Sequence, residues 1–258
     1  MPFEQDIHRL REFLKDDVRM RTDFENTHQN QGIPMPPVEK PIPEGALVVP
    51  LPEWKGLPLT GTLDTLIAAR RSRRRYTDAP VSAKELSFLL WATQGVRENK
   101  PGRVLRTVPS AGNRHSTETY LALTQPIRDG EGQTLFTPGI WRYLPLEHAL
   151  TCLHCPDDLE ERVSAAALDQ GFVGRAPLTF FWTSIPYRTE WRYAQASHKV
   201  IALDAGHICQ NLYLACGAIS CGTCAVAAYD QPAADALVQA DGQEEFVIYM
   251  APVGKVSP

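Results

Sequence analysis

The segment from Val200 to Asp230 constrains the fold of this chain more than any other. Its first two-thirds carries small and aliphatic residues at spacings of three and four, so a helix formed there is apolar on almost every side. Such a helix must be covered on almost all sides. At about 1.5 Å per residue it spans roughly 30 Å, the width of a small domain. We predict a central helix, then a short buried strand over 223–229, with a flat molecule or a second subunit packed against this pair.

Composition excludes several classes of protein. The chain has 258 residues, 43% of them apolar, and a net charge of −4, which argues against a general nucleic-acid or anionic-membrane binder. No uncharged apolar run of about 18 residues is present, and the N-terminus lacks a basic segment followed by an apolar one. Six cysteines are too few for a disulfide scaffold. We therefore expect a cytoplasmic protein that contacts neither a membrane nor nucleic acid.

The first sixty residues differ from the rest. Residues 5–21 have a thin apolar stripe typical of an amphipathic helix on the outside of the molecule. Eight prolines between 34 and 58 exclude a helix there and predict an extended arm. The apolar residues of the arm indicate that it docks on the same protein or on a partner subunit. We divide the chain into an N-terminal helix and proline-rich arm (1–60) and a main domain (61–258).

The main domain mixes helices and strands without regular alternation. Ser82 and Glu85 have the spacing of a capping box, which predicts a helix over 83–94 closed by Gly95. A polar loop is expected over 96–108. The other expected elements are helices over 63–71, 156–167 and 232–239 and strands over 119–124, 140–144, 178–185 and 245–250. This pattern is that of one α+β domain.

Five arginines lie within residues 70–75, interrupted only by Ser72. Their charges repel one another, and a phosphate monoester would neutralise them through charge-assisted hydrogen bonds. On a helix, Arg70 and Arg74 would share one face. Taken alone, the run fits a phosphate site and a solvated basic or nucleic-acid-binding face equally well.

Two further segments are candidates for chemistry. Residues 109–113 are small, so another molecule can approach their backbone closely, although a plain tight turn has the same pattern. The pairs CLHC (152–155) and CGTC (221–224) have the spacing of zinc or redox sites. Because CGTC follows the central helix instead of beginning a helix, we expect buried thiols and no metal. Among the histidines, His115 is the candidate for meeting a substrate, and His207 is expected to be a core residue.

With these segments in view, the chain resembles the nitroreductase superfamily and, within it, the SagB/ThcOx-type dehydrogenases that use flavin mononucleotide (FMN). The resemblance rests on four stretches in the family's order: RRSRRRYTDAPVSAKELSFLLWATQG (70–95), PSAGNRHSTETYL (109–121), LDAGHICQNLYLACGAISCGTCAVAAYD (203–230) and EEFVIYMAPVGK (244–255). It implies an α+β fold with a mixed central sheet flanked by helices. It also implies an intertwined homodimer with two FMN sites at the interface between the central helices.

The resemblance also implies roles for individual residues. Positions matching the phosphate- and ribityl-binding run are Arg70, Arg71, Ser72 and Arg74, and Lys255 matches a second cation on the phosphate. Pro109, Ser110, Ala111 and Asn113 match a turn along the isoalloxazine, across the dimer interface. The backbone N–H groups of Ala227 and Ala228 match positions at the flavin N5 edge. His115 and Lys199 are the candidate catalytic residues, and no metal is implied.

These features together predict an FMN-dependent oxidoreductase that moves hydride through flavin N5 between a donor such as NAD(P)H, as co-substrate, and a small organic acceptor. The family's azoline-oxidising branch has a Lys-Tyr pair before the central helix, whereas this chain has Lys199-Val200. Because Val200 has no hydroxyl, this difference counts against azoline oxidation. An azoline dehydrogenase that tailors a peptide natural product is an alternative function. A flavin-binding protein without redox turnover is another.

Overall fold

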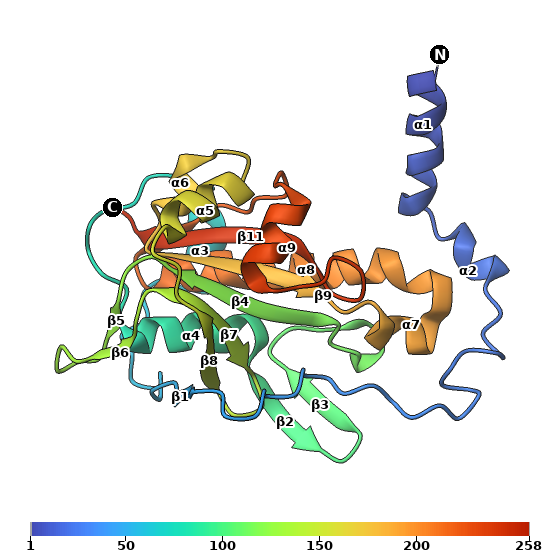
Figure 1. Ribbon diagram of the computed structural model, residues 1–258, viewed down its shortest axis with the longest axis horizontal. Coiled ribbons are helices and arrows are strands. Elements are labelled where there is room, and N and C mark those ends of the chain that lie inside the picture. The colour runs from blue at the N-terminus through green and yellow to red at the C-terminus, as the bar shows by residue number, and fades with distance from the viewer. Residues whose placement is uncertain (1, 258) are drawn as a thin grey trace.

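The computed structural model describes residues 2–257 and is built around a seven-stranded sheet (Figure 1). The strand order is β1-β8-β7-β4-β9-β11-β10, and all six pairings are antiparallel, so the sheet is antiparallel rather than mixed. The strands of this sheet are β1 (Val48–Pro50), β4 (Thr117–Leu123), β7 (Gly139–Leu144), β8 (Ala149–His154), β9 (Leu178–Ser184), β10 (Cys221–Thr223) and β11 (Phe246–Lys255). The expected α+β fold is confirmed.

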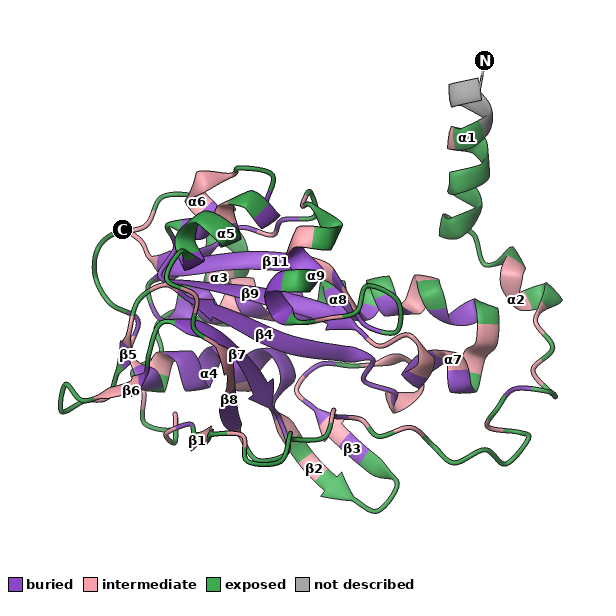
Figure 2. Ribbon diagram, in the orientation of Figure 1, coloured by how far each residue is buried: buried purple, intermediate pink, exposed green. Residues whose placement is uncertain are grey.

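Helices cover both faces of the sheet, and its central strands are therefore buried on both sides (Figure 2). Side chains alternate between the faces along each strand. On β9, Phe180 and Trp182 pack with α4 (Ala83–Gln94) and α8 (His198–Ala218), while Phe181 packs on the opposite face. The helices of that second face are α5 (Leu159–Ala166), α6 (Gly171–Gly174) and α9 (Gln231–Val238).

The predicted central helix is α8, and it has an exposed side. Its buried residues, among them Ile208 and Leu212, pack on the sheet and on α4. Leu203 is 53% exposed, and Gly206, His207, Gln210 and Gly217 continue the exposed stripe along the helix. The expectation that His207 is a core residue is therefore wrong. A helix that the sequence makes apolar almost all round is thus left uncovered along one side of a single chain.

The capping box before α4 is confirmed. The Ser82 Oγ atom accepts a hydrogen bond from the backbone N–H of Glu85, and the Glu85 carboxylate accepts one from the backbone N–H of Ser82. The N–H of Gly95 closes the other end on the Trp91 carbonyl. Leu86, Leu89 and Leu90 of this helix are fully buried. The sequence pattern and the tertiary contacts therefore agree over this helix.

Several expectations about local structure are wrong. Residues 96–108 form a hairpin, β2 (Val96–Lys100) and β3 (Arg103–Arg106), instead of a loop. The strand expected over 223–229 ends at Thr223, and an irregular loop follows it. Helix α3 (Leu63–Ala69) stops before the arginines, so residues 70–75 are extended rather than helical. Elements that the sequence did not indicate are β1, β8, the hairpin β5 (Ile127–Arg128) and β6 (Thr134–Phe136), and α7 (Tyr187–Tyr193).

The expected N-terminal helix is broken into two. Helix α1 (Pro2–Arg11) and α2 (Asp17–Arg21) are joined through a short 3-10 turn (Glu12–Leu14), and α1 projects away from the body of the molecule (Figure 1). Leu10, Phe13 and Leu14 are all exposed. The apolar stripe of this segment is thus largely uncovered in one chain.

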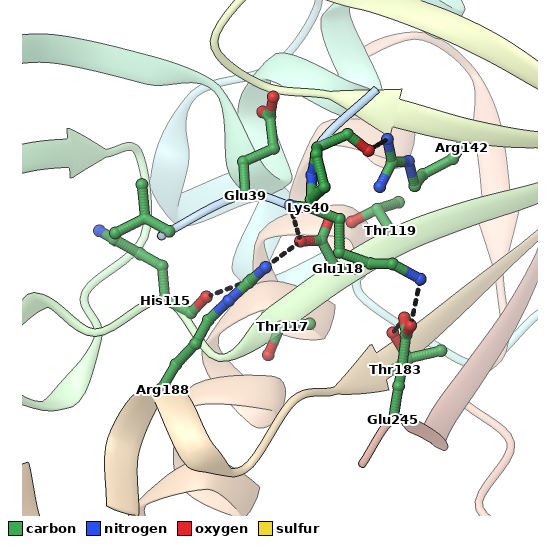
Figure 3. Close-up of polar contacts among 12 residues, drawn as sticks. Glu39, Lys40, His115, Thr117, Glu118, Thr119, Arg142, Thr183, Arg188 and Glu245 are labelled. Atoms are coloured by element: carbon green, nitrogen blue, oxygen red, sulfur yellow. Dashed lines mark hydrogen bonds and ion pairs between the residues drawn. The ribbon is translucent and has the colours of Figure 1, made fainter. Parts of the chain in front are cut away.

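The proline-rich arm docks on its own chain, which was one of the two expected docking surfaces. Because proline has no backbone N–H, the arm cannot form a regular hydrogen-bonded strand here, and its carbonyl groups accept hydrogen bonds from side chains of the main domain. Arg106 donates to the Val38 carbonyl at 2.8 Å, and Arg142 donates to the Pro41 carbonyl at 2.9 Å. In return, the backbone N–H of Lys40 donates to the buried Glu118 carboxylate, which also pairs with Arg188 at 2.6 Å (Figure 3). The arm then enters the sheet as β1, at its edge beside β8.

Candidate active site

The arginine run lies beside the end of α8. The backbone N–H of Arg73 donates to the Thr223 carbonyl at 2.9 Å, which fixes the extended run alongside β10. Arg70, Arg71, Arg74 and Arg75 are exposed. Within residues 2–257, none of the five guanidiniums has a carboxylate within 4.0 Å. Arg70 and Arg71 line a cavity of about 240 Å³. The run is thus a set of unneutralised cations at a hollow of the surface.

Tyr213 connects this run to the loop after β10. The Arg70 guanidinium lies over the Tyr213 ring, 5.4 Å from its centroid. The phenol oxygen contacts Ser72 Oγ at 2.9 Å and accepts a hydrogen bond from the Ala225 N–H at 2.8 Å. Sequence reasoning missed Tyr213, although a tyrosine in a helix that is otherwise aliphatic was a signal, since a buried phenol needs a partner.

The loop after β10 is held from its other side by α6. Gln170 donates to the Ala228 carbonyl at 3.0 Å, and its neighbour Phe172 lies under Arg74, at 5.9 Å between guanidinium carbon and ring centroid. Ala227 and Ala228 are exposed, and neither backbone N–H has an acceptor in the described part of the chain. Within the described residues, this loop thus carries two unpaired backbone donors, and it is connected to Arg70 through Tyr213 and to Arg74 through α6.

Lys255 does not offer a free charge to the cavity that Arg70 and Arg71 line. Its ammonium group donates to the Glu85 carboxylate and, at 2.8 Å, to the Ile219 carbonyl. It does not line the cavity that Arg70 and Arg71 share. The phosphate-binding role that the resemblance implied for Lys255 is therefore not supported, because its charge already has a partner. The ion pair instead joins the last strand to the capping box of α4.

An apolar cavity adjoins the same loop. It has a volume of about 550 Å³, and Ala227 forms part of its wall together with Ile201, Ala205 and Tyr249. Phe13 of the N-terminal segment also reaches this wall. Burial raises the pKa of Tyr249 to about 12, so its hydroxyl stays protonated at neutral pH. Ala227 thus carries a backbone N–H without an acceptor among the described residues and also forms part of the wall of an apolar cavity.

The turn at 109–113 lies elsewhere on α8. Its Ala111 N–H donates to the Asp204 carboxylate at 3.0 Å. Gly112 has a φ of 57°, and a Cβ there would lie 2.6 Å from the Tyr193 hydroxyl, so only glycine fits. Along the helix, Asp204 precedes Tyr213 by about 14 Å. In one chain, the turn carrying Pro109 and Asn113 and the arginine run thus contact different parts of α8.

The two candidate catalytic residues differ in access. His115 is 3% exposed, and its Nε2 contacts the Val104 carbonyl at 2.8 Å and Asn113 Oδ1 at 2.9 Å. Burial, and then the charge of Arg106, lowers its pKa to about 3. These contacts argue against a catalytic role. Lys199 lies in the first turn of α8, one turn before the exposed Leu203, and is partly accessible.

The two cysteine pairs differ in burial. Cys221 and Cys224 are buried, as expected, and burial raises the pKa of Cys221 to about 12. Residues 2–257 contain no group of three or more His, Cys, Asp or Glu side chains placed to hold a metal. Cys152 and Cys155 lie close together at the end of β8.

Among the described helices, none combines the length and apolarity that a bilayer crossing requires.

Comparison with known proteins identifies the class. The Nitroreductase family model matches residues 67–255, and the chain belongs to that family. It is therefore an oxidoreductase. The chain is similar to a candidate nitroreductase of Methanocaldococcus jannaschii, at 29% identity over 194 residues that cover 75% of this chain and 90% of the relative.

Solved structures share the fold. A candidate nitroreductase from Ralstonia eutropha is 25% identical, with a TM-score of 0.66 over 87% of this chain and 99% of that one. A chain of the Escherichia coli microcin synthetase McbBCD, solved with truncated pro-MccB17 bound, is 18% identical, with a TM-score of 0.60 over 79% of this chain and 77% of that one. The expected nitroreductase fold is therefore confirmed.

Proposed function

We propose that this protein is an FMN-dependent oxidoreductase that passes hydride between a donor such as NAD(P)H and a small organic acceptor. The observation that carries the proposal is the convergence at the loop after β10. There, among the residues that the structure describes, Arg70 and Arg74 have no carboxylate partner and the N–H groups of Ala227 and Ala228 have no acceptor, and an apolar cavity opens at Ala227. A flavin nucleotide has a phosphate that suits the arginines, a polar ring edge that suits the two N–H groups and an apolar ring face that suits the cavity.

The residues present fit the group. Exposed guanidiniums without carboxylate partners suit a phosphate, which accepts charge-assisted hydrogen bonds from Arg70, Arg71 and Arg74. Ser72 Oγ, held by Tyr213, is a further donor for the ribityl-phosphate end. The free N–H groups of Ala227 and Ala228 suit a ring nitrogen or carbonyl, and Ile201 and Ala205 suit the apolar ring.

The roles of the chain's residues follow from this placement. FMN, when bound, would supply two-electron redox chemistry. The arginines bind and orient, and the Ala227–Ala228 backbone stabilises negative charge that develops on the ring edge. Ile201, Ala205 and Phe13 exclude water from the reacting face. Lys199 is the remaining candidate for moving a proton, because His115 is buried and neutral.

We propose further that the protein is a homodimer in the cytoplasm whose α8 helices pack together. The exposed stripe of α8 from Leu203 to Gly217 is apolar or small at most positions and needs a partner. A two-fold axis across α8 would bring Asp204 of one chain, with its 109–113 turn, toward Tyr213 of the other. Pro109, Ser110, Ala111 and Asn113 would then complete the partner's flavin site.

Removing the phosphate contacts tests the cofactor assignment. We expect the Arg70→Ala/Arg74→Ala double variant to be purified without yellow colour and to bind FMN at least about 100-fold more weakly, since each of the two charge-assisted contacts contributes about 1.5–3 kcal/mol. The matched control is Arg103→Ala/Arg128→Ala, which removes two exposed arginines elsewhere. Unchanged FMN affinity in the first variant, measured by fluorescence titration, would refute the assignment.

Azoline oxidation is the second candidate function. Lys199 is partly accessible at the start of α8, at the position of the lysine in the azoline-oxidising branch, and the McbBCD likeness concerns fold alone. Parallel assays separate the candidates. NAD(P)H consumption with quinone or nitro acceptors supports the first, and loss of two hydrogens from an azoline peptide supports the second. Reduction of the flavin by dithionite alone would instead indicate a protein without turnover.

A further inference from the structure

Two thiols outside the proposed active site lie within contact distance of each other. The Sγ atoms of Cys152 and Cys155 are 3.5 Å apart at the end of β8. Cys155 is exposed and Cys152 is partly accessible. A disulfide requires about 2.0 Å between the sulfur atoms, so closing the gap needs about 1.5 Å of side-chain movement.

A β-bulge explains why these thiols meet. In a regular strand, residues three apart point to opposite faces. In the β7–β8 ladder, however, Trp141 faces Cys152 while the preceding Ile140 faces His154, so Leu153 is an extra residue. The extra residue shifts the alternation by one position, which puts Cys152 and Cys155 on the same face. The approach of the two thiols is thus a property of the backbone.

The surroundings hold this geometry in place. On the neighbouring strand, a Cβ at Gly139 would lie 2.7 Å from Cys155 Sγ, so the glycine leaves room for the thiol. Between the cysteines, His154 Nε2 contacts the Leu237 carbonyl of α9 at 2.8 Å. The backbone between the two cysteines is therefore anchored on α9, and Gly139 leaves space for the Cys155 thiol.

We propose that Cys152 and Cys155 are a redox-active dithiol that hydroperoxides convert to a disulfide. The Cys155 thiolate attacks the outer oxygen of the peroxide, the O–O bond breaks, and the alcohol or water leaves with a proton. The Cys152 sulfur then attacks the resulting sulfenic sulfur, and its proton leaves with the hydroxyl as water. Two thiols and one hydroperoxide thus give one disulfide, one alcohol or water and one further water. The two thiols are oxidised and the peroxide is reduced.

The order of the two thiols follows from their environments. Attack on a peroxide requires an accessible thiolate, which favours the exposed Cys155. Burial, together with the Cys155 thiol, raises the pKa of Cys152 to about 11, so Cys152 is the poorer first nucleophile and is left for the resolving step. The other four cysteines are buried, and within the described residues no two of their sulfurs contact each other. They serve as internal controls.

Hydrogen peroxide added to the native, purified full-length protein tests the proposal. We expect the intact mass to fall by two hydrogen atoms and peptide mapping to find a single disulfide between Cys152 and Cys155. A thiol reagent should react with two thiols before the treatment and with none after it, and dithiothreitol should restore both. Cys221 and Cys224 should remain reduced throughout.

Single variants separate the roles of the two thiols. Cys152→Ser should stop at a sulfenic acid on Cys155 that a dimedone probe captures, and Cys155→Ser should react at least ten-fold more slowly. The proposal is overturned if wild-type protein acquires sulfinic or sulfonic acid on Cys155 while Cys152 stays a thiol, or if neither thiol reacts. Because mapping of the wild-type protein decides this, a variant that fails to fold does not affect the result.

Discussion

His115 shows how its surroundings set the role of a single residue. Histidine next to a small-residue turn suggests acid–base chemistry, because its ordinary pKa lies near neutrality. Here the Val104 carbonyl and Asn113 hold the ring in a buried position, and its pKa falls from 6.5 to about 3. The imidazole therefore stays neutral in the folded protein at any pH where the protein is expected to work.

This shift makes stability depend on pH. Between pH 6.5 and about 3 the unfolded chain binds a proton at His115 and the folded chain does not, so the free energy of unfolding falls as pH falls, by about 1.4 kcal/mol per pH unit. We expect His115→Asn to flatten this dependence by about 2 kcal/mol between pH 6.5 and 5. Chemical denaturation at both pH values measures it.

Glu39 of the arm acts with the opposite sign and is the control. Burial, and then the charges of Glu147 and Glu118, raises its pKa from 4.5 to about 7. The folded chain then holds a proton that the unfolded chain releases, so this contribution to stability is present below pH 4.5 and is lost as pH rises through 7. Glu39→Gln should therefore make the loss of stability on acidification steeper. If both variants keep the wild-type pH profile, the two assignments are wrong.

At the scale of elements, short-range signals and tertiary contacts meet at the start of α4. The Ser82–Glu85 box satisfies orphan N–H groups of the first turn, and the same Glu85 receives the Lys255 ammonium from the last strand. A cap predicted from local sequence thus also joins two distant parts of the chain. Glu85 is consequently more than a local cap.

We expect Ser82→Ala to lower the free energy of unfolding by about 1 kcal/mol, the usual effect of losing an N-cap side chain. The variant leaves Glu85 free to keep its pairing with Lys255. Lys84→Ala, at an exposed position in the first turn of the same helix, is the matched control and should change stability by less than about 0.5 kcal/mol. Equal midpoints for the two variants in urea denaturation would contradict the capping argument.

At the scale of the whole molecule, the two halves of the proposed site lie on different parts of α8. The arginines meet Tyr213, whereas the 109–113 turn meets Asp204. One chain therefore does not bring together all the residues that the resemblance assigned to one flavin. The exposed stripe of α8 supports a second copy as the missing part, and this part of the proposal has its own test.

We expect Leu203→Glu to convert a dimer into a monomer in sedimentation velocity and to reduce bound flavin at least ten-fold. A carboxylate on each α8 would have to be desolvated in the seam, which is costly for an unpaired charge. Leu168→Glu, at a similarly exposed leucine after α5, is the control and should leave both measurements unchanged. A wild-type monomer with full flavin content would refute the proposed seam.

Signals carried by neighbouring residues were readable in the sequence. The apolar spacing of α8, the cap of α4 and the apolar, β-branched and aromatic composition of β9 concern residues within a few positions of each other, and all three predicted elements are confirmed. The arginine run was also visible, although its predicted helical geometry is wrong, because α3 ends at Ala69. The edge strand β1 and its neighbour β8 were missed because pairing with other strands stabilises them, and the partner of β1 lies about a hundred residues further along the chain.

The sequence by itself determined the class of fold, the central helix and the cluster of cations, because each depends on local composition and spacing. Tertiary structure alone decided which cations stay free, since Glu85 neutralises Lys255 whereas no carboxylate in the described part of the chain reaches Arg70 or Arg74. It also decided that His115 is buried and that a bulge in β8 brings Cys152 to Cys155. The physical reason is that charge pairing, desolvation and strand register depend on groups distant in the sequence, which only folding places side by side.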